Sequence, residues 1–367
     1  MPTLPSTMTG VLLMGHGGFD RLVFRTDLPV PVPGVGEVLV RVRAAGVNNT
    51  DINMRTGWYS KSVTVGATPV GGEAGILAAS VEDAGGTGAP LSFPRIQGAD
   101  ACGEIIAVGP TVDPARIGER VIVEPVFRQA TGAVGATAEP VYFGSDCPGA
   151  FADYVSVPSL NAHRITSSLS DADLASFPCS YSAAENMLAR ADLRAGETVL
   201  VTGASGGVGS AAVQLARRRG GRVIALAAPE KAAEVGGLGA DRVLPRNVDL
   251  VGALDPQSVD VVVDVVGGGR FPALLQVLRR GGRYAVAGAI AGAIVALDLR
   301  TLYLKDMQLL GCTLPQPGVF TDLVGYIERG EVRPVVARTY PLAAIADAQR
   351  DFLTKRHTGK IVLLLEA

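Results

Sequence analysis

A glycine-rich turn between an apolar stretch and a helical pattern limits the fold of this chain more than any other feature. Residues 199–216 read VLVTGASGGVGSAAVQLA, so a short apolar strand pattern leads into glycines and then into a helix. A second apolar stretch, RVIALA at 222–227, follows that helix. Strand, turn, helix and strand in this order predict two parallel strands joined by a helix.

The spacing of the glycines indicates what the turn binds. Gly203, Gly206 and Gly209 are three positions apart. Without side chains, the backbone can approach a pyrophosphate, whose charge then lies against free N–H groups at the helix start. A tight turn without a ligand is the alternative, but the strands and the helix around it favour a dinucleotide site. The predicted cofactor contacts in the turn are Gly203, Ala204, Ser205, Gly206, Gly207, Val208 and Gly209.

The pattern around this turn extends over a whole domain. Strands that are apolar throughout, such as VDVVVDVVGG (259–268) and RYAVAGA (283–289), alternate with helical segments such as FPALLQVLRRGG (271–282). Such strands indicate a parallel sheet with helices on both faces. We therefore place a dinucleotide-binding domain at residues 171–319.

The first part of the chain differs from this pattern. Residues 36–47, 101–109 and 120–126 alternate with period two and predict half-buried strands. Two Gly- and Ala-rich stretches, 60–95 and 128–149, lie among them, and loops of that length are usually functional or disordered.

The end of the chain changes character again. We predict helices near 320–329 and 342–355, then a strand at 360–366 that returns to the first domain. The β-rich domain is thus expected to comprise residues 1–170 and 320–367.

Composition limits the class of protein. The net charge is −2 over 367 residues, so nothing favours nucleic acid or an anionic membrane as partner. No apolar stretch reaches the ~18 residues that span a bilayer, and the start lacks the basic region of a signal peptide. The four cysteines form no CxxC pair, so we expect free thiols in a reducing cytoplasm. These cysteines are Cys102, Cys147, Cys179 and Cys312. The expected partner is a small-molecule substrate.

Stretches along nearly the whole chain occur in the order known from one protein family. They include PGVGEVLVRVRAAGVNNTD (33–51), IQGADACGEIIAVG (96–109), GAFADYVSVP (149–158), DLRTLYLKDMQLLGCT (298–313) and HTGKIVL (357–363). With the glycine turn, they resemble the medium-chain dehydrogenase/reductase superfamily, on its quinone-oxidoreductase-like side. The resemblance implies an α/β protein with a GroES-like β-rich catalytic domain and a Rossmann domain with a doubly wound parallel sheet. It also implies an active site between the domains, and a homodimer or homotetramer.

Many members of this family hold a catalytic zinc through a Cys, a His and a second Cys. By resemblance these positions fall at Asn48, Ala99 and Cys179, and only Cys179 keeps a ligand. Zinc sites of this kind need three protein ligands plus water, so we predict no catalytic metal. The family's structural zinc needs four closely spaced cysteines, but region 124–147 contains only Cys147, so we predict no metal there either.

A substrate oxygen must then be held by hydrogen-bond donors. Zinc-independent relatives also tend to carry Asn at the position of Asn48, and an amide donates without protonation. Thr50 matches a proton-relay Ser or Thr of the zinc relatives, and Asp51 could orient either group. Judged from the sequence alone, a turn cap is the favoured role for these residues. The resemblance reverses this preference for Asn48, and to a lesser degree for Thr50 and Asp51. Tyr59 and Tyr181 are candidate proton donors, although each could instead be a packing aromatic.

The choice of dinucleotide depends on the end of the strand at 222–227. NAD sites carry an acidic residue roughly 20 positions after the glycine turn, where it binds the ribose 2′-hydroxyl. Ala227 and Ala228 occupy that place, so we predict NADPH, with Lys231 and Arg246 near its 2′-phosphate unless they are ordinary surface charges. By resemblance, further cofactor contacts are Asn48, Val265, Val266, Ala287, Gly288, Ala289, Cys312, Thr313 and Lys360.

These expectations combine into one predicted function. We expect hydride transfer from NADPH to an electron-poor C=C bond or a quinone, without zinc. One alternative is an alcohol or aldehyde dehydrogenase of the same superfamily that uses a metal through unusual ligands. Another is a protein that binds NADPH but catalyses nothing. The segment 60–95 is longer than the family leads us to expect, and we predict that it borders the substrate cleft as a mobile lid or widens the pocket.

Overall fold

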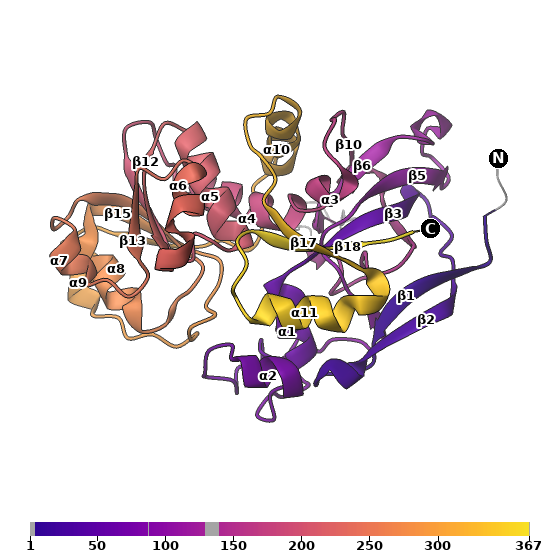
Figure 1. Ribbon diagram of the computed structural model, residues 1–367, viewed down its shortest axis with the longest axis horizontal. Helices are drawn as coiled ribbons and strands as arrows, with labels where there is room; N and C mark the ends of the chain where they lie inside the picture. Colours follow the sequence, from indigo (N-terminus) through magenta and orange to yellow (C-terminus); the bar gives the residue numbers. More distant parts are fainter. Residues whose placement is uncertain (1–3, 87, 129–138, 367) are drawn as a thin grey trace.

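The computed structural model describes residues 4–86, 88–128 and 139–366, which form two lobes (Figure 1). The nucleotide lobe, salmon to orange in Figure 1, is built on a parallel sheet. The catalytic lobe, indigo to magenta with the yellow last segment, is built on mainly antiparallel strands. No helix among these residues is both long and apolar enough to cross a membrane.

Six parallel strands form the sheet of the nucleotide lobe. The order is β13 (Arg242–Pro245), β12 (Arg222–Ala227), β11 (Thr198–Val201), β14 (Val259–Asp264), β15 (Leu278–Val286) and β16 (Gln308–Gly311). Strand order reverses between β11 and β14, which is the point where such sheets bind ligands. The predicted doubly wound sheet is confirmed. Its helices are α4 (Pro178–Arg190), α5 (Gly207–Arg218), α6 (Ala232–Gly237), α7 (Leu250–Ala253), α8 (Phe271–Val277) and α9 (Leu299–Leu304).

One helix of this lobe is shorter than predicted. We expected a helix over 271–282, but α8 ends at Val277 and β15 already begins at Leu278. Leu278 pairs with Val259 of β14, and the pairing then shifts before Arg283. Pairing of β15 with β14 therefore overrides the helical pattern of residues 278–282 in the sequence.

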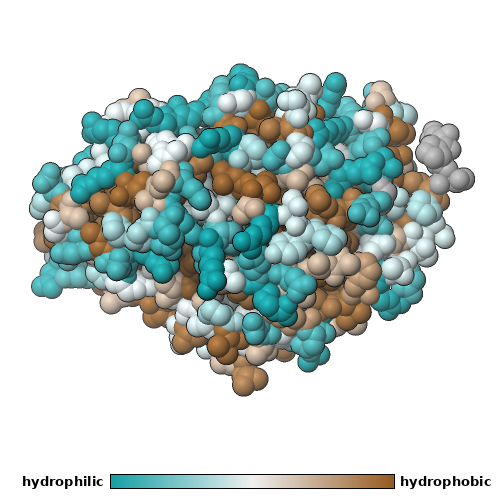
Figure 2. Space-filling view, viewed as in Figure 1, coloured by the Kyte–Doolittle hydropathy of each residue, from teal (hydrophilic) through white to brown (hydrophobic). Residues whose placement is uncertain are grey.

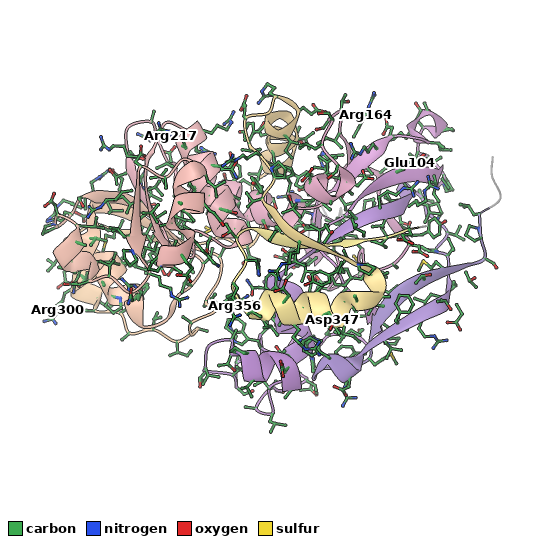
Figure 3. The ribbon with its side chains drawn as sticks, in the orientation of Figure 1. Glu104, Arg164, Arg217, Arg300, Asp347 and Arg356 are labelled. Atoms are coloured by element: carbon green, nitrogen blue, oxygen red, sulfur yellow. The ribbon has the colours of Figure 1, made fainter. Side chains whose placement is uncertain are left out.

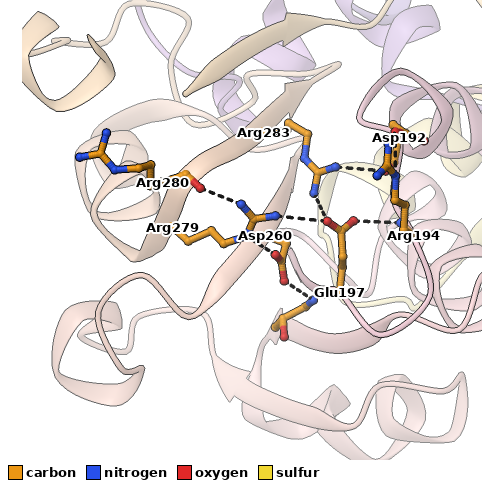
Figure 4. A network of polar contacts seen from close by, with 8 residues as sticks. Asp192, Arg194, Glu197, Asp260, Arg279, Arg280 and Arg283 are labelled. Atoms are coloured by element: carbon orange, nitrogen blue, oxygen red, sulfur yellow. Dashed lines mark hydrogen bonds and ion pairs between the residues drawn. The ribbon is translucent and has the colours of Figure 1, made fainter. Parts of the chain in front are cut away.

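Charged side chains join the amino ends of these strands (Figure 4). Glu197, just before β11, accepts a hydrogen bond of 2.6 Å from Arg283 and one of 3.4 Å from Arg279. Asp260 of β14 pairs with Arg279 and accepts the backbone N–H of Thr198 at 2.7 Å. We call Glu197, Asp260, Arg279 and Arg283 the edge network; it ties β11, β14 and β15 together at the end opposite the glycine turn.

The catalytic lobe is organised around a mixed sheet. Its path is β10 (Ala162–Arg164), β6 (Arg120–Val123), β5 (Cys102–Val108), β3 (Glu37–Val47), β18 (Lys360–Leu364) and β17 (Val336–Pro341), with β9 (Tyr154–Pro158) also on β3. β18 pairs antiparallel with β3, so the predicted return of this strand to the first domain is confirmed. Smaller sheets contain β1 (Thr7–Leu13), β2 (Leu22–Pro29) and β4 (Arg95–Ile96), and β7 (Val126–Arg128) and β8 (Pro140–Tyr142).

The helices of this lobe lie where its strands end. They are α1 (Asn49–Thr56), α2 (Pro69–Ala74), α3 (Asp171–Leu174) and α11 (Ile345–Leu353). α2 belongs to the segment 60–95, which was expected to be one long loop and instead contains a helix. In the other Gly- and Ala-rich stretch, 128–149, residues 129–138 lie outside the described part of the chain.

One helix after β16 packs on the nucleotide lobe. α10 (Val319–Glu328) contacts α4, and its Phe320, Leu323 and Ile327 belong to the same hydrophobic core as the buried face of α5. The domain limits predicted at residues 319 and 320 therefore remain a prediction, with α10 the element closest to the change of lobe.

Candidate active site

The glycine turn has the shape that its sequence predicts. α5 begins at Gly207, and Gly203 adopts a positive φ of 57°. A side chain at Gly209 would place its Cβ 2.1 Å from the carbonyl oxygen of Gly203, and a Cβ at Gly207 would lie 2.6 Å from Oγ of Ser180. Gly206 is exposed. The turn therefore depends on missing side chains and leaves room for a pyrophosphate at the start of a twelve-residue helix.

The catalytic lobe reaches this turn through the start of β18. The backbone N–H of Gly359 donates to the carbonyl oxygen of Ser205 at 2.8 Å, and Gly206 forms an isolated bridge with Gly359. The next residue, Lys360, passes so close that a Cβ on Gly207 would lie 2.9 Å from its Cδ. The backbone contact thus brings a lysine against a dinucleotide turn.

The ammonium group of Lys360 lies in a buried polar cluster. Its Nζ is 2.7 Å from Oδ2 of Asp100 and 2.5 Å from Oδ1 of Asn48. Nδ2 of Asn48 donates to Oδ2 of Asp100 at 2.8 Å, and the backbone N–H of Cys179 donates to Oδ1 of Asp100 at 2.6 Å. Asp100 and Lys360 are 0% and 3% exposed in their side chains. A buried ion pair of this kind is tolerated only when its remaining hydrogen-bond positions are filled, as they are at Asp100.

Local structure places Asn48 at the start of α1. The backbone N–H of Asn48 donates to Oδ2 of Asp51 at 2.8 Å, so Asp51 caps the helix, as one interpretation of the sequence allowed. The Asn48 side chain is instead drawn into the cluster. Nδ2 of Asn48 also lies at a longer 3.3 Å from the carbonyl oxygen of Gly46.

Asp51 is also an unusual acid. Burial raises its pKa to about 7, against the lowering effect of the Asn48 N–H and of the Lys360 charge, while the nearby Asp100 raises it further. Oδ1 of Asp51 is buried and has no hydrogen-bond partner among the described residues. The carboxyl group is therefore able to hold a proton near neutral pH.

Two of the other predicted catalytic residues lie beside this group. Burial raises the pKa of Tyr59, and hydrogen bonds with the side chains of Thr50 and Asn53 lower it again. The phenol also lies near enough to Cys179 and Asp51 to respond to their charges. The structure therefore brings Asn48, Thr50, Asp51 and Tyr59 together around the start of α1.

Tyr181 does not join them. It lies in the core of the nucleotide lobe, where its hydroxyl group donates to the carbonyl oxygen of Arg333 at 2.6 Å and accepts from Nε2 of Gln214 at 2.8 Å. Burial raises its pKa well above the usual range. The structure does not support a proton donor at Tyr181, because its O–H already donates to Arg333 within the core.

Nothing in the described part of the chain gathers three potential metal ligands from His, Cys, Asp and Glu. Cys179 is unpaired, and its pKa is raised to about 12, first by burial and then by the charge of Asp100. Burial therefore disfavours the thiolate, the form that binds zinc.

The two basic residues predicted near a 2′-phosphate differ in availability. Nζ of Lys231 donates to the carbonyl oxygens of Lys355 and His357 at 2.7 and 2.6 Å, so this buried amine already joins the two lobes. Burial lowers its pKa. Arg246 is exposed, and its charge reaches Lys231. Arg356, from the segment that Lys231 contacts, lies at the junction of the lobes in Figure 3.

The remaining predicted cofactor contacts lie in loops at the carboxyl ends of β14, β15 and β16. Oδ1 of Asp264 accepts from Oγ1 of Thr202 at 2.5 Å and from the N–H of Val266 at 2.9 Å, which fixes the loop after β14. A Cβ on Gly288 would lie 3.0 Å from the carbonyl oxygen of Val265, so the loops after β14 and β15 touch. These loops and the exposed Thr313 line one edge of the sheet: Val265, Val266, Ala287, Gly288, Ala289, Cys312 and Thr313.

Sequence reasoning missed Asp100 as a member of the site. An aspartate within the apolar stretch IQGADACGEIIAVG is a usable signal, because a buried carboxylate requires a partner. Its partner Lys360 is 260 positions away, so the pair itself was not predictable from spacing.

Comparisons with known proteins agree with this arrangement. The model of the alcohol dehydrogenase GroES-like domain matches residues 34–167, and that of the zinc-binding dehydrogenase matches residues 238–363. A solved structure of a candidate alcohol dehydrogenase from Sinorhizobium meliloti 1021 is 46% identical, with a TM-score of 0.87 over 100% of this chain and 99% of the other.

Two curated relatives carry the names of reductases. The acryloyl-coenzyme A reductase of Metallosphaera sedula is 29% identical over 97% of this chain and 99% of its own length. The quinone oxidoreductase of Homo sapiens is 26% identical over 100% of both chains.

The two lobes therefore belong to a nicotinamide-dependent oxidoreductase. The chain is a member of the medium-chain dehydrogenase/reductase superfamily, on its quinone-oxidoreductase-like side.

Proposed function

We propose that this protein is an NADPH-dependent, zinc-free reductase of electron-poor alkenes, among them α,β-unsaturated thioesters, and of quinones. The observation that carries the proposal is the buried cluster of Asn48, Asp100 and Lys360 beside the glycine turn. An amide and an ammonium group at this point can stabilise negative charge on a substrate oxygen. The names of the relatives from Metallosphaera sedula and Homo sapiens support acceptors of this class.

The residues of the glycine turn would hold the dinucleotide, and the bound nicotinamide supplies the hydride. Asn48 then holds the acceptor's oxygen. One N–H of its amide points to Asp100, and the other makes only the 3.3 Å contact with the carbonyl oxygen of Gly46. That second N–H is the one available to a substrate oxygen, because so long a contact is weak. Lys360 holds Oδ1 of Asn48, so the amide cannot flip.

Tyr59 is the proposed proton donor. Because its pKa is raised by burial, the phenol stays protonated at neutral pH. It can give its proton to the enolate or phenolate that hydride transfer leaves on the substrate. The side chain of Thr50, which lowers the pKa of Tyr59, lies beside the phenol and can orient it.

The same cluster does not fit zinc. Asn48 and Ala99 occupy two of the three family ligand positions, and the third, Cys179, is a protonated thiol. The ammonium group of Lys360 already neutralises Asp100 at 2.7 Å, so a divalent cation there would meet a fixed positive charge. The proposed reaction therefore involves no metal.

The preference for NADPH rests on the end of β12. Ala227 and Ala228 place no carboxylate where NAD sites carry one. Since the amine of Lys231 is already bonded to two carbonyl oxygens, we propose that the exposed Arg246 contacts the 2′-phosphate.

The test is a turnover assay on protein whose metal content has been measured. Oxidation of NADPH and of NADH is followed with enones, unsaturated thioesters, quinones and aldehydes. We expect zinc-free turnover of the first three classes, faster with NADPH, and a loss of about 100-fold in kcat/KM for Asn48→Ala, the size seen for one oxyanion donor. Tyr181→Phe serves as the control that keeps activity.

Other outcomes would contradict the proposal in distinct ways. Turnover of alcohols or aldehydes that requires added zinc would favour an alcohol dehydrogenase, as the name of the Sinorhizobium meliloti structure suggests. Tight NADPH binding without turnover of any acceptor would indicate a protein that only binds the dinucleotide.

A further inference from the structure

The segment 60–86 crosses from the catalytic lobe to the nucleotide lobe, and we call it the arch. Its residues Gly72 and Ile76 are hydrogen-bonded to α1. The guanidinium group of Arg55 is fully buried and donates to the carbonyl oxygens of Gly72 at 2.7 Å and Gly17 at 2.9 Å, and to Oε1 of Gln349 at 2.9 Å. The N–H of Ile76 also donates to the carbonyl oxygen of Thr56 at 3.1 Å. The arch is thus attached to the helix whose first turn carries Asn48.

Polar contacts within the arch hold its shape. The backbone N–H of Lys61 donates to Oδ2 of Asp83 at 2.9 Å, and the N–H of Ser80 donates to Oγ of Ser60 at 3.0 Å. Nε1 of Trp58 donates to the carbonyl oxygen of Val65 at 3.2 Å, just before the tip.

The arch is not held down by buried apolar side chains at its tip. Val65, Val70 and Leu77 are 60%, 77% and 105% exposed. In Figure 2 apolar atoms gather at the lower edge of the molecule, in the region where Figure 1 places α2. The tip of the arch, Gly66 and Ala67, has no large apolar side chain, so backbone contacts fix it.

The tip meets the loop after β15, residues 287–292. The backbone N–H of Ala67 donates to the carbonyl oxygen of Ile290 at 2.8 Å. A Cβ on Gly66 would lie 2.7 Å from that oxygen and 2.9 Å from the carbonyl carbon of Ala291. Only glycine at position 66 permits so close an approach of two backbones.

The same loop is bonded on its other side to the loop after β14. The N–H of Ala291 donates to the carbonyl oxygen of Val266 at 2.8 Å. The N–H of Gly268 donates to the carbonyl oxygen of Gly292 at 3.0 Å. The loop 287–292 thus lies between the arch and the carboxyl end of β14. Since the glycine turn after β11 takes the pyrophosphate, loops after β14 and β15, on the far side of the reversal in strand order, border the nicotinamide half.

We propose that Gly66 and Ala67 are positioning residues that fix the loop 287–292 and thereby the nicotinamide end of the cofactor. This inference rests on the proposed function, because it concerns the same cofactor site. The arch connects the helix that begins at Asn48 with the loop beside the nicotinamide. It is hydrogen-bonded to α1 at Gly72 and Ile76 and to the loop 287–292 at Ala67. It leaves the adenosine half untouched.

Two variants test the proposal from different directions. Ala67→Pro removes the N–H that bonds Ile290, and Gly66→Ala pushes a methyl group against the same oxygen. Ala67→Gly keeps the N–H, and Leu77→Ala changes an exposed part of the arch; both are controls. Affinities are measured for NADPH, by its fluorescence, and for 2′,5′-ADP, which lacks the nicotinamide, by displacement. The emission maximum of bound NADPH is recorded as well.

We expect both test variants to raise the Kd of NADPH about five- to tenfold, the effect of one lost hydrogen bond, and to shift its emission toward that of the free cofactor. The Kd of 2′,5′-ADP should change less than about twofold, and the controls should match the wild type. Equal weakening of both ligands, or no change in either, would overturn the inference. Thermal unfolding of each variant identifies a loss of folding.

Failure of the proposed function would look different. A wild type that binds NADPH tightly but reduces no acceptor would disprove the reductase, whereas the affinity ratio between NADPH and 2′,5′-ADP would still decide the role of the arch. If the wild type prefers NADH, the same ratio is measured with NADH and ADP.

Discussion

The amino ends and the carboxyl ends of the strands in the parallel sheet hold their charges in opposite ways. At the amino ends of the strands, the edge network satisfies its carboxylates with arginines, and Arg279 remains 41% exposed in its side chain. At the carboxyl ends, the polar groups are mostly backbone N–H groups of the glycine turn, and the neighbouring Lys360–Asp100 pair is almost completely buried. The charges at the amino ends therefore stabilise the sheet. At the carboxyl ends, the N–H groups of the glycine turn and the ammonium group of Lys360 are kept for a ligand.

The strongest way to break this contrast is to remove Asp100. Asp100→Ala leaves the buried Lys360 ammonium group without its counter-charge, although Oδ1 of Asn48 still accepts from it, so the free energy of unfolding should fall by about 3–5 kcal/mol. Urea denaturation measures it. Glu104→Ala, which breaks a half-exposed pair with Arg41 on the surface, is the matched control and should cost about 0–1 kcal/mol. Similar losses for both variants would mean that burial of the cluster does not matter.

The second prediction uses pH. The pKa of Asp51 is raised by burial to about 7, above its value in the unfolded chain, so between about pH 4 and 7 the folded protein holds a proton that the unfolded chain has lost. The contribution of Asp51 to stability is then fully present below this window and is lost as the pH rises through it, by up to about 1.4 kcal/mol per unit.

Asp51→Asn isolates this effect, because the amide can still cap α1 but does not titrate. Denaturant unfolding at several pH values should show a flatter profile for the variant than for the wild type. Identical slopes would assign the pH dependence to other groups.

The edge network should respond less than the buried cluster. Glu197→Gln removes the charge that faces Arg283 and Arg279, and we expect a loss of about 1–3 kcal/mol in stability. Because this edge lies away from the glycine turn, kcat should stay within about twofold of the wild type. A large loss of kcat with unchanged stability would mean that the two edges do not have separate roles.

The smallest effect concerns the two tyrosines. Tyr181→Phe loses hydrogen bonds to Arg333 and Gln214 and should cost about 1 kcal/mol of stability without changing turnover. Tyr59→Phe should reverse the pattern, with stability nearly kept and kcat reduced. Equal kinetic effects would remove the distinction between a core phenol and a site phenol.

Local patterns in the sequence predicted those parts of the fold that depend on neighbouring residues. The glycine turn was predictable because its strand, glycines and helix are consecutive, and the structure follows that order. The end of α8 was not, because the pairing of Leu278 with Val259 depends on a strand elsewhere in the chain. Sequence reasoning worked where the cause lies within a few residues.

The site shows the same limit. Asn48 was identified through the family resemblance, while Asp100 was not assigned to the site, although the two side chains are in direct contact. Tyr59 and Tyr181 were equivalent candidates in the sequence, since burial and hydrogen-bond partners distinguish them and neither is encoded locally. The segment 60–95 had no readable pattern for its contact with Ile290, because that contact involves only backbone atoms.

The position of β18 has a consequence for how the chain acquires its structure during synthesis. β18 lies between β3 and β17 in the sheet, and its first residue contacts Asn48, which is 312 positions earlier. On the ribosome, β3 therefore stays unpaired where β18 later pairs with it, until the entire nucleotide lobe has been translated. Contacts so distant in sequence slow folding and expose strand edges, so this lobe should be the part most dependent on chaperones.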